Sequence, residues 1–393
     1  MGHEFSTSFL RASKCELETA DHRHETIHAF RRRSWAPKSP PDMLHELDVP
    51  VLLRRSYVRH GYRPLHRSLR YYVSSAFTWH NELVNFWTHF VPLIGLYLFY
   101  ILPELSAERP RATVLFGYAG VSCLFLCSAV THLMHSRSPL DHVFWLLVDF
   151  SGIALFSLSV GVTRFACRAE NSPLFTSVRP LQSPSSLSSH PIVQIYVPGL
   201  ASIILLQYLT TCGFFVIWPF WKTRHAIRIL SCGAVAFWIY VPLYDRYLAS
   251  AWEQLMAVAA GDGLTGNSTL VSFLLQFPAS SADASLALHN RGFHFLLAAG
   301  FFMGANFPEC CAPGRFDLVG YGHQLFHLCI TCVTWCVCET VDIDCAQRLD
   351  GPPGLASDPM LRPLLWITFA ALSTVLIAVT TFLSHARKKA VQY

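Results

Sequence analysis

The sequence predicts an all-α protein that crosses a membrane several times, and three observations support this fold class. Of the 393 residues, 52% are hydrophobic and only 14% are charged, whereas soluble domains carry about 25% charged residues. The apolar residues gather in eight continuous segments, each close to the ~20 residues that a helix needs to cross the hydrocarbon core. Aromatic and polar residues flank the first segment, as is typical of a membrane interface.

The eight expected spans follow a polar, basic N-terminal segment that contains no apolar core of the signal-peptide kind. The sixth span is the least apolar, because His289, Arg291 and His294 stand at its start. The eighth is a continuous apolar run that ends in a basic tail. The spans are expected at residues 86–103, 113–135, 140–163, 193–219, 226–248, 287–306, 320–341 and 362–385.

The placement of basic residues predicts a cytoplasmic N-terminus. With both termini inside, 21 of the 30 Lys and Arg residues fall on the cytoplasmic side, as the positive-inside rule requires. The glycosylation sequon Asn267-Ser268-Thr269 then lies outside. The expected organisation is a cytoplasmic segment 1–72, a seven-helix core 73–341, an outer loop 342–361, an eighth transmembrane helix 362–385 and a cytoplasmic tail 386–393.

The seventh expected span begins with two histidines, His323 and His327. Because they are four residues apart, their side chains share one face of a helix, a spacing that suits two ligands of one metal ion. Soluble zinc proteases carry a glutamate after the first histidine as general base, and Gln324 in that position argues against a peptidase of this kind. Two satisfied interfacial histidines are the alternative to a metal site.

Three more polar residues are expected at the same depth as this pair. Ser128 and His132, again four residues apart, lie near the inner end of the second span, and Asp149 is an isolated acid within the third. Ionisable side chains inside a membrane are costly and usually functional. Three imidazoles and a carboxylate are what a zinc site needs, so we predict zinc bound by His132, His323 and His327. The alternative is that each polar side chain only bonds to a neighbouring helix.

The motifs around these residues resemble the progestin and adipoQ receptor family over residues 55–340. The branch of membrane progestin receptors is suggested by His60-Gly61-Tyr62-Arg63-Pro64, by Arg70-Tyr71-Tyr72 and by the eighth span. The family motifs are His80-Asn81-Glu82-x-x-Asn85-x-Trp87-Thr88-His89, Ser128-x-x-x-His132, Asp149, and Pro313-Gly314-Arg315-Phe316-Asp317 followed by His323-x-x-x-His327.

This resemblance implies a seven-helix bundle of the adiponectin-receptor type, with the N-terminus cytoplasmic and a zinc ion held by His132, His323 and His327. Ser128 and Asp149 are then expected around the water bound there. Two functions stay open. One is a receptor in the plasma membrane that binds a steroid or another lipid and signals inward to a cytoplasmic partner. The other is a zinc-dependent, ceramidase-like hydrolase of lipid amides, with Asp149 and Ser128 as catalytic residues.

The remaining features carry weaker predictions. Cys310, Cys311 and Cys345 fall in loops, and the sequence alone does not pair them. Three further histidines near the inner boundary are interpreted as interfacial from their aromatic and polar neighbours. No nucleic-acid partner is expected, and membrane lipids are the expected surroundings. These interfacial histidines are His80, His89 and His135.

Overall fold

The computed structural model describes residues 42–168, 191–218, 224–259, 284–346 and 355–391. Within these ranges the chain is helical and contains no strand, apart from an isolated antiparallel bridge between Leu44 and Tyr62. The expected all-α fold is therefore confirmed. The sequon at Asn267 and the first 41 residues lie outside the described part of the chain.

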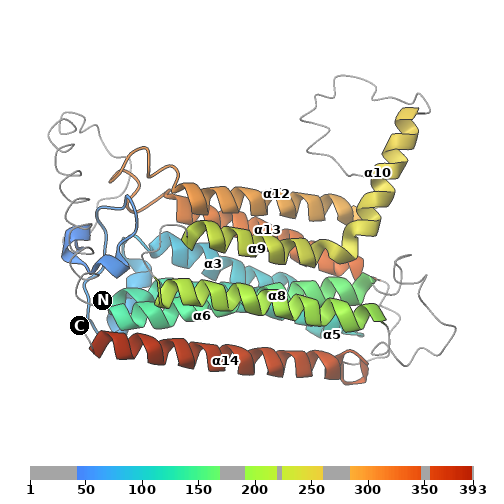
Figure 1. The fold of residues 1–393 in the computed structure, drawn as a ribbon, viewed down its shortest axis with the longest axis horizontal. Coiled ribbons are helices and arrows are strands. Elements are labelled where there is room, and N and C mark those ends of the chain that lie inside the picture. Colours follow the sequence, from blue (N-terminus) through green and yellow to red (C-terminus); the bar gives the residue numbers. More distant parts are fainter. Residues whose placement is uncertain (1–41, 169–190, 219–223, 260–283, 347–354, 392–393) are drawn as a thin grey trace, which may run out of the picture. The chain divides into compact units, whose positions relative to one another are not determined.

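Apart from α10, the long helices lie side by side (Figure 1), and 3₁₀ turns join α5 to α6 and α9 to α10. In chain order the elements are η2 (Glu46–Asp48), η3 (Val51–Leu53), α2 (Leu69–Ser74), η4 (Ser75–Phe77), α3 (Leu83–Leu96), the π-helical turn η5 (Tyr97–Ile101), α4 (Leu102–Ser106), α5 (Ala112–Met134), η6 (His135–Arg137), α6 (Pro139–Arg168), α8 (Pro191–Val216), α9 (Arg224–Tyr240), η8 (Val241–Leu243), α10 (Tyr244–Ala259), α12 (Ala284–Ala305), α13 (Gly322–Asp344), η10 (Leu355–Ser357) and α14 (Leu361–Val391).

Seven helical segments of the described chain are long and apolar enough to cross a membrane, and they match seven of the eight expected spans. The C-terminal helix α14 is among them. The sixth expected span is also a helix, α12, which packs against α13; it does not reach the same apolarity. The seven segments are Leu83–Ser106, Ala112–Arg137, Pro139–Cys167, Ile195–Val216, Ala226–Ser250, Gly322–Asp344 and Leu361–Lys388.

The closest helix packing joins α5 to α6, and small residues make it possible. A Cβ atom added at Gly152 of α6 would lie 2.8 Å from the Cβ of Cys127 and 2.9 Å from the carbonyl oxygen of Cys123, both on α5. Only glycine therefore allows this approach, as in many membrane helix pairs. Gly152 is one turn from Asp149, and Cys127 precedes Ser128, so the same packing brings these two polar side chains together.

Residues 42–77 pack against the end of the bundle at which α13 begins. Val58, Tyr62 and Tyr321 are buried in one small apolar cluster. The carboxylate of Asp317 accepts hydrogen bonds from the backbone N–H groups of Arg59 and His60. This N-terminal part is therefore folded onto the bundle rather than separate from it.

The two ends of the bundle carry different chemistry. His132 lies in the last turn of α5 and His323 in the first turn of α13, and we call their end the histidine end. A disulfide joins Cys167, near the end of α6, to Cys345, directly after α13; this is the disulfide end. Since α13 has 23 residues, its two ends are roughly 33 Å apart at 1.5 Å per residue.

Candidate metal centre

The structure brings together the three histidines that the sequence predicts as metal ligands. One ring nitrogen from each of His132, His323 and His327 can be chosen so that all three lie within 4.8 Å of one another. The ring centroids of His132 and His327 are 4.7 Å apart, as are those of His323 and His327. The spacing of four residues along α13 places two rings on one face, and α5 supplies the third from its last turn.

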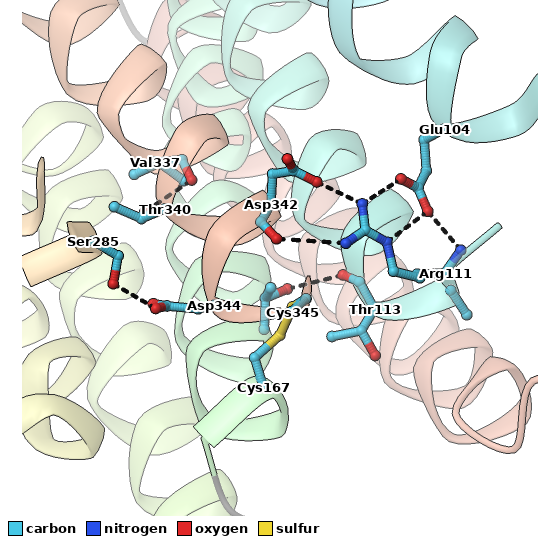
Figure 2. The surroundings of a disulfide bond; sticks show 12 residues. Glu104, Arg111, Thr113, Cys167, Ser285, Val337, Thr340, Asp342, Asp344 and Cys345 are labelled. Atoms are coloured by element: carbon cyan, nitrogen blue, oxygen red, sulfur yellow. Dashed lines mark hydrogen bonds and ion pairs between the residues drawn. A yellow bond between two sulfur atoms is a disulfide. The ribbon is translucent and has the colours of Figure 1, made fainter. Parts of the chain in front are cut away.

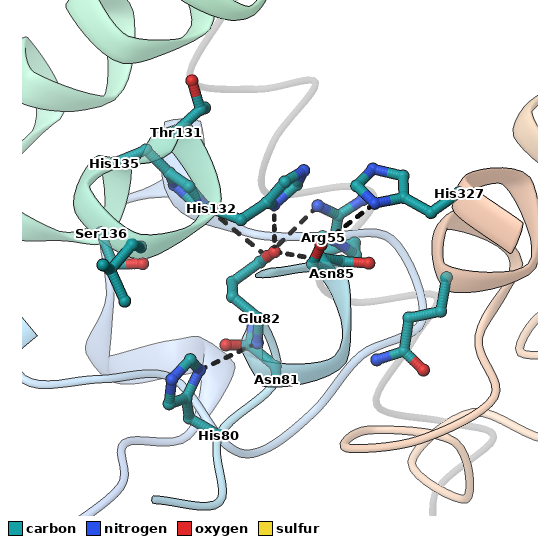
Figure 3. Close-up of polar contacts among 12 residues, drawn as sticks. Arg55, His80, Asn81, Glu82, Asn85, Thr131, His132, His135, Ser136 and His327 are labelled. Carbon is teal, nitrogen blue, oxygen red and sulfur yellow. Dashed lines mark hydrogen bonds and ion pairs between the residues drawn. The ribbon is translucent and has the colours of Figure 1, made fainter. Parts of the chain in front are cut away.

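Glu82, directly before α3, is the centre of the hydrogen bonding beneath these rings (Figure 3). Its Oε2 accepts hydrogen bonds from Nδ1 of His132 at 2.7 Å and from the side-chain amide of Asn85 at 2.6 Å. Its Oε1 accepts one from Arg55 at 3.2 Å, and Nε2 of His135 lies 3.7 Å away. Glu82 is 2% exposed, so these partners replace solvent around its charge.

The charge state of Glu82 sets the tautomer of His132. Burial by itself raises the pKa of this carboxyl, but the positive charge of Arg55, the hydrogen bond from His132 and the nearby His135 hold the pKa well below its usual range. An ionised carboxylate only accepts hydrogen bonds, so Nδ1 of His132 must be the protonated nitrogen. Its Nε2 then carries a lone pair, and this atom is buried without a hydrogen-bond partner.

His327 is oriented in the same way by a different acceptor. Its Nδ1 lies 3.2 Å from the backbone carbonyl oxygen of Asn85 and 3.2 Å from the hydroxyl of Thr88. A carbonyl oxygen can only accept, so Nδ1 donates and Nε2 carries the lone pair. Metal-binding histidines commonly donate their second N–H to a carboxylate or a carbonyl, and both arrangements occur here.

The donor set fits a metal ion on these grounds. A buried imidazole nitrogen without a partner is costly, and a cation shared with two neighbouring imidazoles removes that cost. Three histidines are a common ligand set for zinc. A second group, formed by Glu82, His132 and His135, also has its ligand atoms within 4.8 Å. It shares His132 with the first, and its carboxylate is already bonded to Arg55 and Asn85.

Ser128 and Asp149 meet next to this site but are not members of either histidine group. Ser128 is one turn before His132 on α5 and is 2% exposed. Asp149 of α6 lies near it, close enough for an electrostatic interaction. The placement of both residues around a metal-bound water and their catalytic roles stay predictions.

Three other histidines, which the sequence suggests are interfacial, are buried in the described structure. His80, His89 and His135 are each 5% exposed or less. The ring of His89 stacks on that of His327 with centroids 3.9 Å apart, and Nε2 of His80 bonds to the carbonyl oxygen of Ser75. The aromatic and polar residues around them suggested a membrane interface, and in the described structure all three rings are covered by other parts of the protein.

The sequence interpretation also missed the roles of Arg55 and Glu82. Neither has a spacing that singles it out, because their partners lie on other segments. The one local signal is Asn85, three residues after Glu82, which is the distance at which side chains on a helix meet. The bond from Nδ2 of Asn85 to Glu82 uses that spacing.

The disulfide end holds a separate set of polar contacts (Figure 2). Arg111 binds Glu104 at 2.7 Å and Asp342 at 2.6 Å. The sequence alone did not identify a partner for Cys345, and the structure pairs it with Cys167 in a disulfide. Cys310 and Cys311 are free, with their sulfur atoms 3.8 Å apart.

The fold and the site define a class of protein: a helical membrane protein of many spans with a buried cluster of histidines and one carboxylate at one end of the bundle. The family model for haemolysin-III related proteins matches residues 77–179 and 192–338. The chain therefore belongs to the haemolysin-III related family, that is, to the progestin and adipoQ receptors expected from its motifs.

Curated relatives are similar over most of their length. Membrane progestin receptor alpha of Sus scrofa is 29% identical over 322 residues, which cover 79% of this chain and 79% of that protein. Membrane progestin receptor beta of Homo sapiens is 27% identical over 316 residues, covering 78% and 77%. Membrane progestin receptor delta of Mus musculus is 27% identical over 315 residues, covering 78% and 80%.

Proposed function

We propose that the protein is a membrane receptor for a steroid or another lipid, and that His132, His323 and His327 hold a zinc ion in its histidine end. The similarity to proteins named membrane progestin receptors over about four fifths of the chain carries the receptor assignment. The lone pairs on Nε2 of His132 and His327 carry the metal assignment. A bound zinc ion supplies a fixed double positive charge and Lewis acidity at this place.

The histidine end faces the cytoplasm in this proposal. The distribution of basic residues supports it, since 21 of 30 fall on that side. The disulfide between Cys167 and Cys345 supports it independently, because disulfides persist in oxidising compartments and are rare in the cytosol. Ligand binding within the plasma membrane would then be passed inward to a cytoplasmic partner at the end where residues 42–77 cover the site.

The second candidate function is a zinc-dependent hydrolase of lipid amides. The position of Asp149 near Ser128 favours it, because Ser128 lies one helix turn before His132 on α5. A carboxylate near the proposed metal can accept a proton, which is the role of a general base.

Ligand binding by purified protein in lipid nanodiscs tests the receptor assignment. Saturable binding of a radiolabelled progestin, competed by unlabelled steroid, is the expected result, and conversion of a ceramide to fatty acid is measured in the same sample. Turnover of the amide without steroid binding would reverse the order of the two functions. Epitope tags at both termini should be stained only after permeabilisation, and a terminus stained in intact cells would overturn the orientation.

A further inference from the structure

Arg63 is a buried cation whose two terminal nitrogens make four hydrogen bonds, and it belongs to none of the groups discussed so far. It lies in an extended part of the chain before Pro64 and is 1% exposed. Its Nη1 donates to the carbonyl oxygen of Leu133 at 2.7 Å and its Nη2 to that of His132 at 2.8 Å. Both acceptors are backbone carbonyl groups in the last turn of α5, which carries the metal-ligand candidate His132.

The last turn of a helix leaves carbonyl groups without partners in the helix. In α5, which ends at Met134, the carbonyls of His132 and Leu133 are two of these groups. Arginine side chains are known to bond such carbonyls. Here one planar guanidinium donates to both carbonyl groups. It therefore fixes the orientation of the turn and also supplies the hydrogen bonds that these carbonyls lack within the helix.

The guanidinium is itself held from the other side. Nη1 also donates to the hydroxyl of Ser75 at 2.8 Å and Nη2 to that of Ser136 at 2.9 Å. The carbon Cζ lies 5.5 Å from the ring centre of Tyr72, within the range of a cation–π contact. Arginine stays protonated in proteins, so the side chain carries a positive charge.

We propose that Arg63 is a positioning residue of the metal centre: by clamping the last turn of α5, it aims the imidazole of His132 between Glu82 and the two histidines of α13. This inference rests on the proposed metal site. Glu82 fixes the ring of His132 through its Nδ1, and Arg63 fixes the backbone from which that ring extends. The N-terminal segment thus completes a site whose ligands all lie on later helices.

The geometry calls for arginine in particular. Four acceptors surround the two terminal nitrogens of Arg63, and guanidinium presents its donors in a fixed planar fork, whereas the ammonium of lysine is a compact charge with three donors. Arg63→Lys keeps the positive charge but cannot donate to the carbonyls of His132 and Leu133 in the same geometry. Arg111→Lys is the matched control, because Arg111 is also buried, at 7% exposure, and directly precedes α5 at the opposite end.

The test measures zinc affinity of the full-length variants by competition with a chromophoric chelator, and thermal stability after zinc removal. Loss of outer-shell support for metal ligands typically lowers affinity by about 10–100-fold, and we expect this for Arg63→Lys. Arg111→Lys should lower stability while zinc affinity stays within about 3-fold. Equal changes of affinity in both variants, or none in Arg63→Lys, would overturn the proposal.

A second measurement separates this inference from the metal assignment. If the wild-type protein binds no zinc through His132, the proposed metal site fails, and the clamp is then tested in the metal-free protein by double-mutant cycles. Arg63→Lys and Glu82→Gln both act on His132, so their effects on the unfolding equilibrium should deviate from additivity by a factor of about 3 or more. The pair Arg111→Lys and Glu82→Gln should be additive, and additivity in both cycles overturns the proposal.

A variant that removes one contact covers the case in which Arg63→Lys does not fold. Ser136→Ala deletes one of the four acceptors of Arg63 and leaves the other three. Its zinc affinity is measured by the same chelator competition, and it is combined with Glu82→Gln in the same double-mutant cycle. A loss of zinc affinity smaller than that of Glu82→Gln but above that of Arg111→Lys is expected, and an affinity equal to that of wild type overturns the proposal.

Discussion

The two ends of α13 show how the same residue types serve different purposes. At the disulfide end, His289 donates to Asp344 at 2.8 Å, and the same carboxylate binds Arg246 at 3.2 Å. At the histidine end, His132 donates to Glu82 at 2.7 Å, and that carboxylate binds Arg55 at 3.2 Å. The two pairs are alike in distance, burial and partner charge.

The difference lies in what surrounds the second nitrogen of each histidine. At the histidine end, Nε2 of His132 is buried without a hydrogen-bond partner, and one ring nitrogen of His132 lies within 4.8 Å of a ring nitrogen of both His323 and His327. Among the described residues, Nδ1 of His289 meets no comparable group of ligand atoms. A carboxylate–histidine pair by itself therefore does not indicate a metal site. Further ligand atoms must lie close to the second nitrogen of the histidine. Four substitutions sharpen this comparison.

The largest effect is expected from His132→Ala. Removing one of three ligands should reduce bound zinc from about one ion per chain to less than about a tenth, measured by elemental analysis after purification. His289→Ala is the control, because it removes a histidine of equal burial from the disulfide end and should leave zinc in place. Full zinc occupancy in His132→Ala would contradict the ligand assignment, and so would equal losses in both variants.

Asp149→Asn distinguishes the two candidate functions. The substitution keeps the size and one oxygen for the contact with Ser128 but removes the base. In a hydrolase, turnover should fall by about 10²–10⁴ with zinc still bound, which is the usual contribution of general-base catalysis. In a receptor, steroid affinity should stay within about 3-fold, since the substitution preserves the shape of the site. Parallel assays of amide turnover, steroid binding and zinc content check both outcomes.

Cys167→Ser tests whether the disulfide end is structural. The bond connects residues 178 positions apart, and loss of such a cross-link typically costs about 2–4 kcal/mol in the free energy of unfolding. We expect a lower unfolding temperature and unchanged zinc content. Cys232→Ser, which replaces a free cysteine, should leave stability unchanged. A loss of zinc in Cys167→Ser would show that the two ends are coupled through α13.

Glu82→Gln is expected to have the smallest effect. Glutamine keeps the shape of the side chain but not the charge that fixes the tautomer of His132. Zinc affinity should fall by about 10–100-fold, as is typical when a carboxylate bonded to a metal-binding histidine is lost. Glu104→Gln provides the control at the disulfide end, where the carboxylate pairs with Arg111; chelator competition should give it the affinity of wild type. Unchanged affinity in Glu82→Gln would mean that the carboxylate only compensates Arg55.

The sequence by itself determined the helical membrane fold and three metal-ligand candidates. In lipid, the backbone N–H and C=O groups of an apolar run of about 20 residues find hydrogen-bond partners only if the run is helical. The spans therefore follow from local composition. The pair His323 and His327 follows from the helical repeat, because a spacing of four residues fixes which side chains share a face. His132 was found through its depth, which also follows from position along a helix.

The tertiary structure decided the surroundings of these ligands. Glu82, Arg55 and Arg63 lie before the helices they support, and no helical spacing connects them to His132. The pairing of Cys167 with Cys345 depends on which helix ends meet, and the stacking of His89 on His327 depends on the packing of α3 against α13. Local rules reach about one helix turn, whereas these contacts join segments tens to hundreds of residues apart. Only the packing of the whole bundle brings them together.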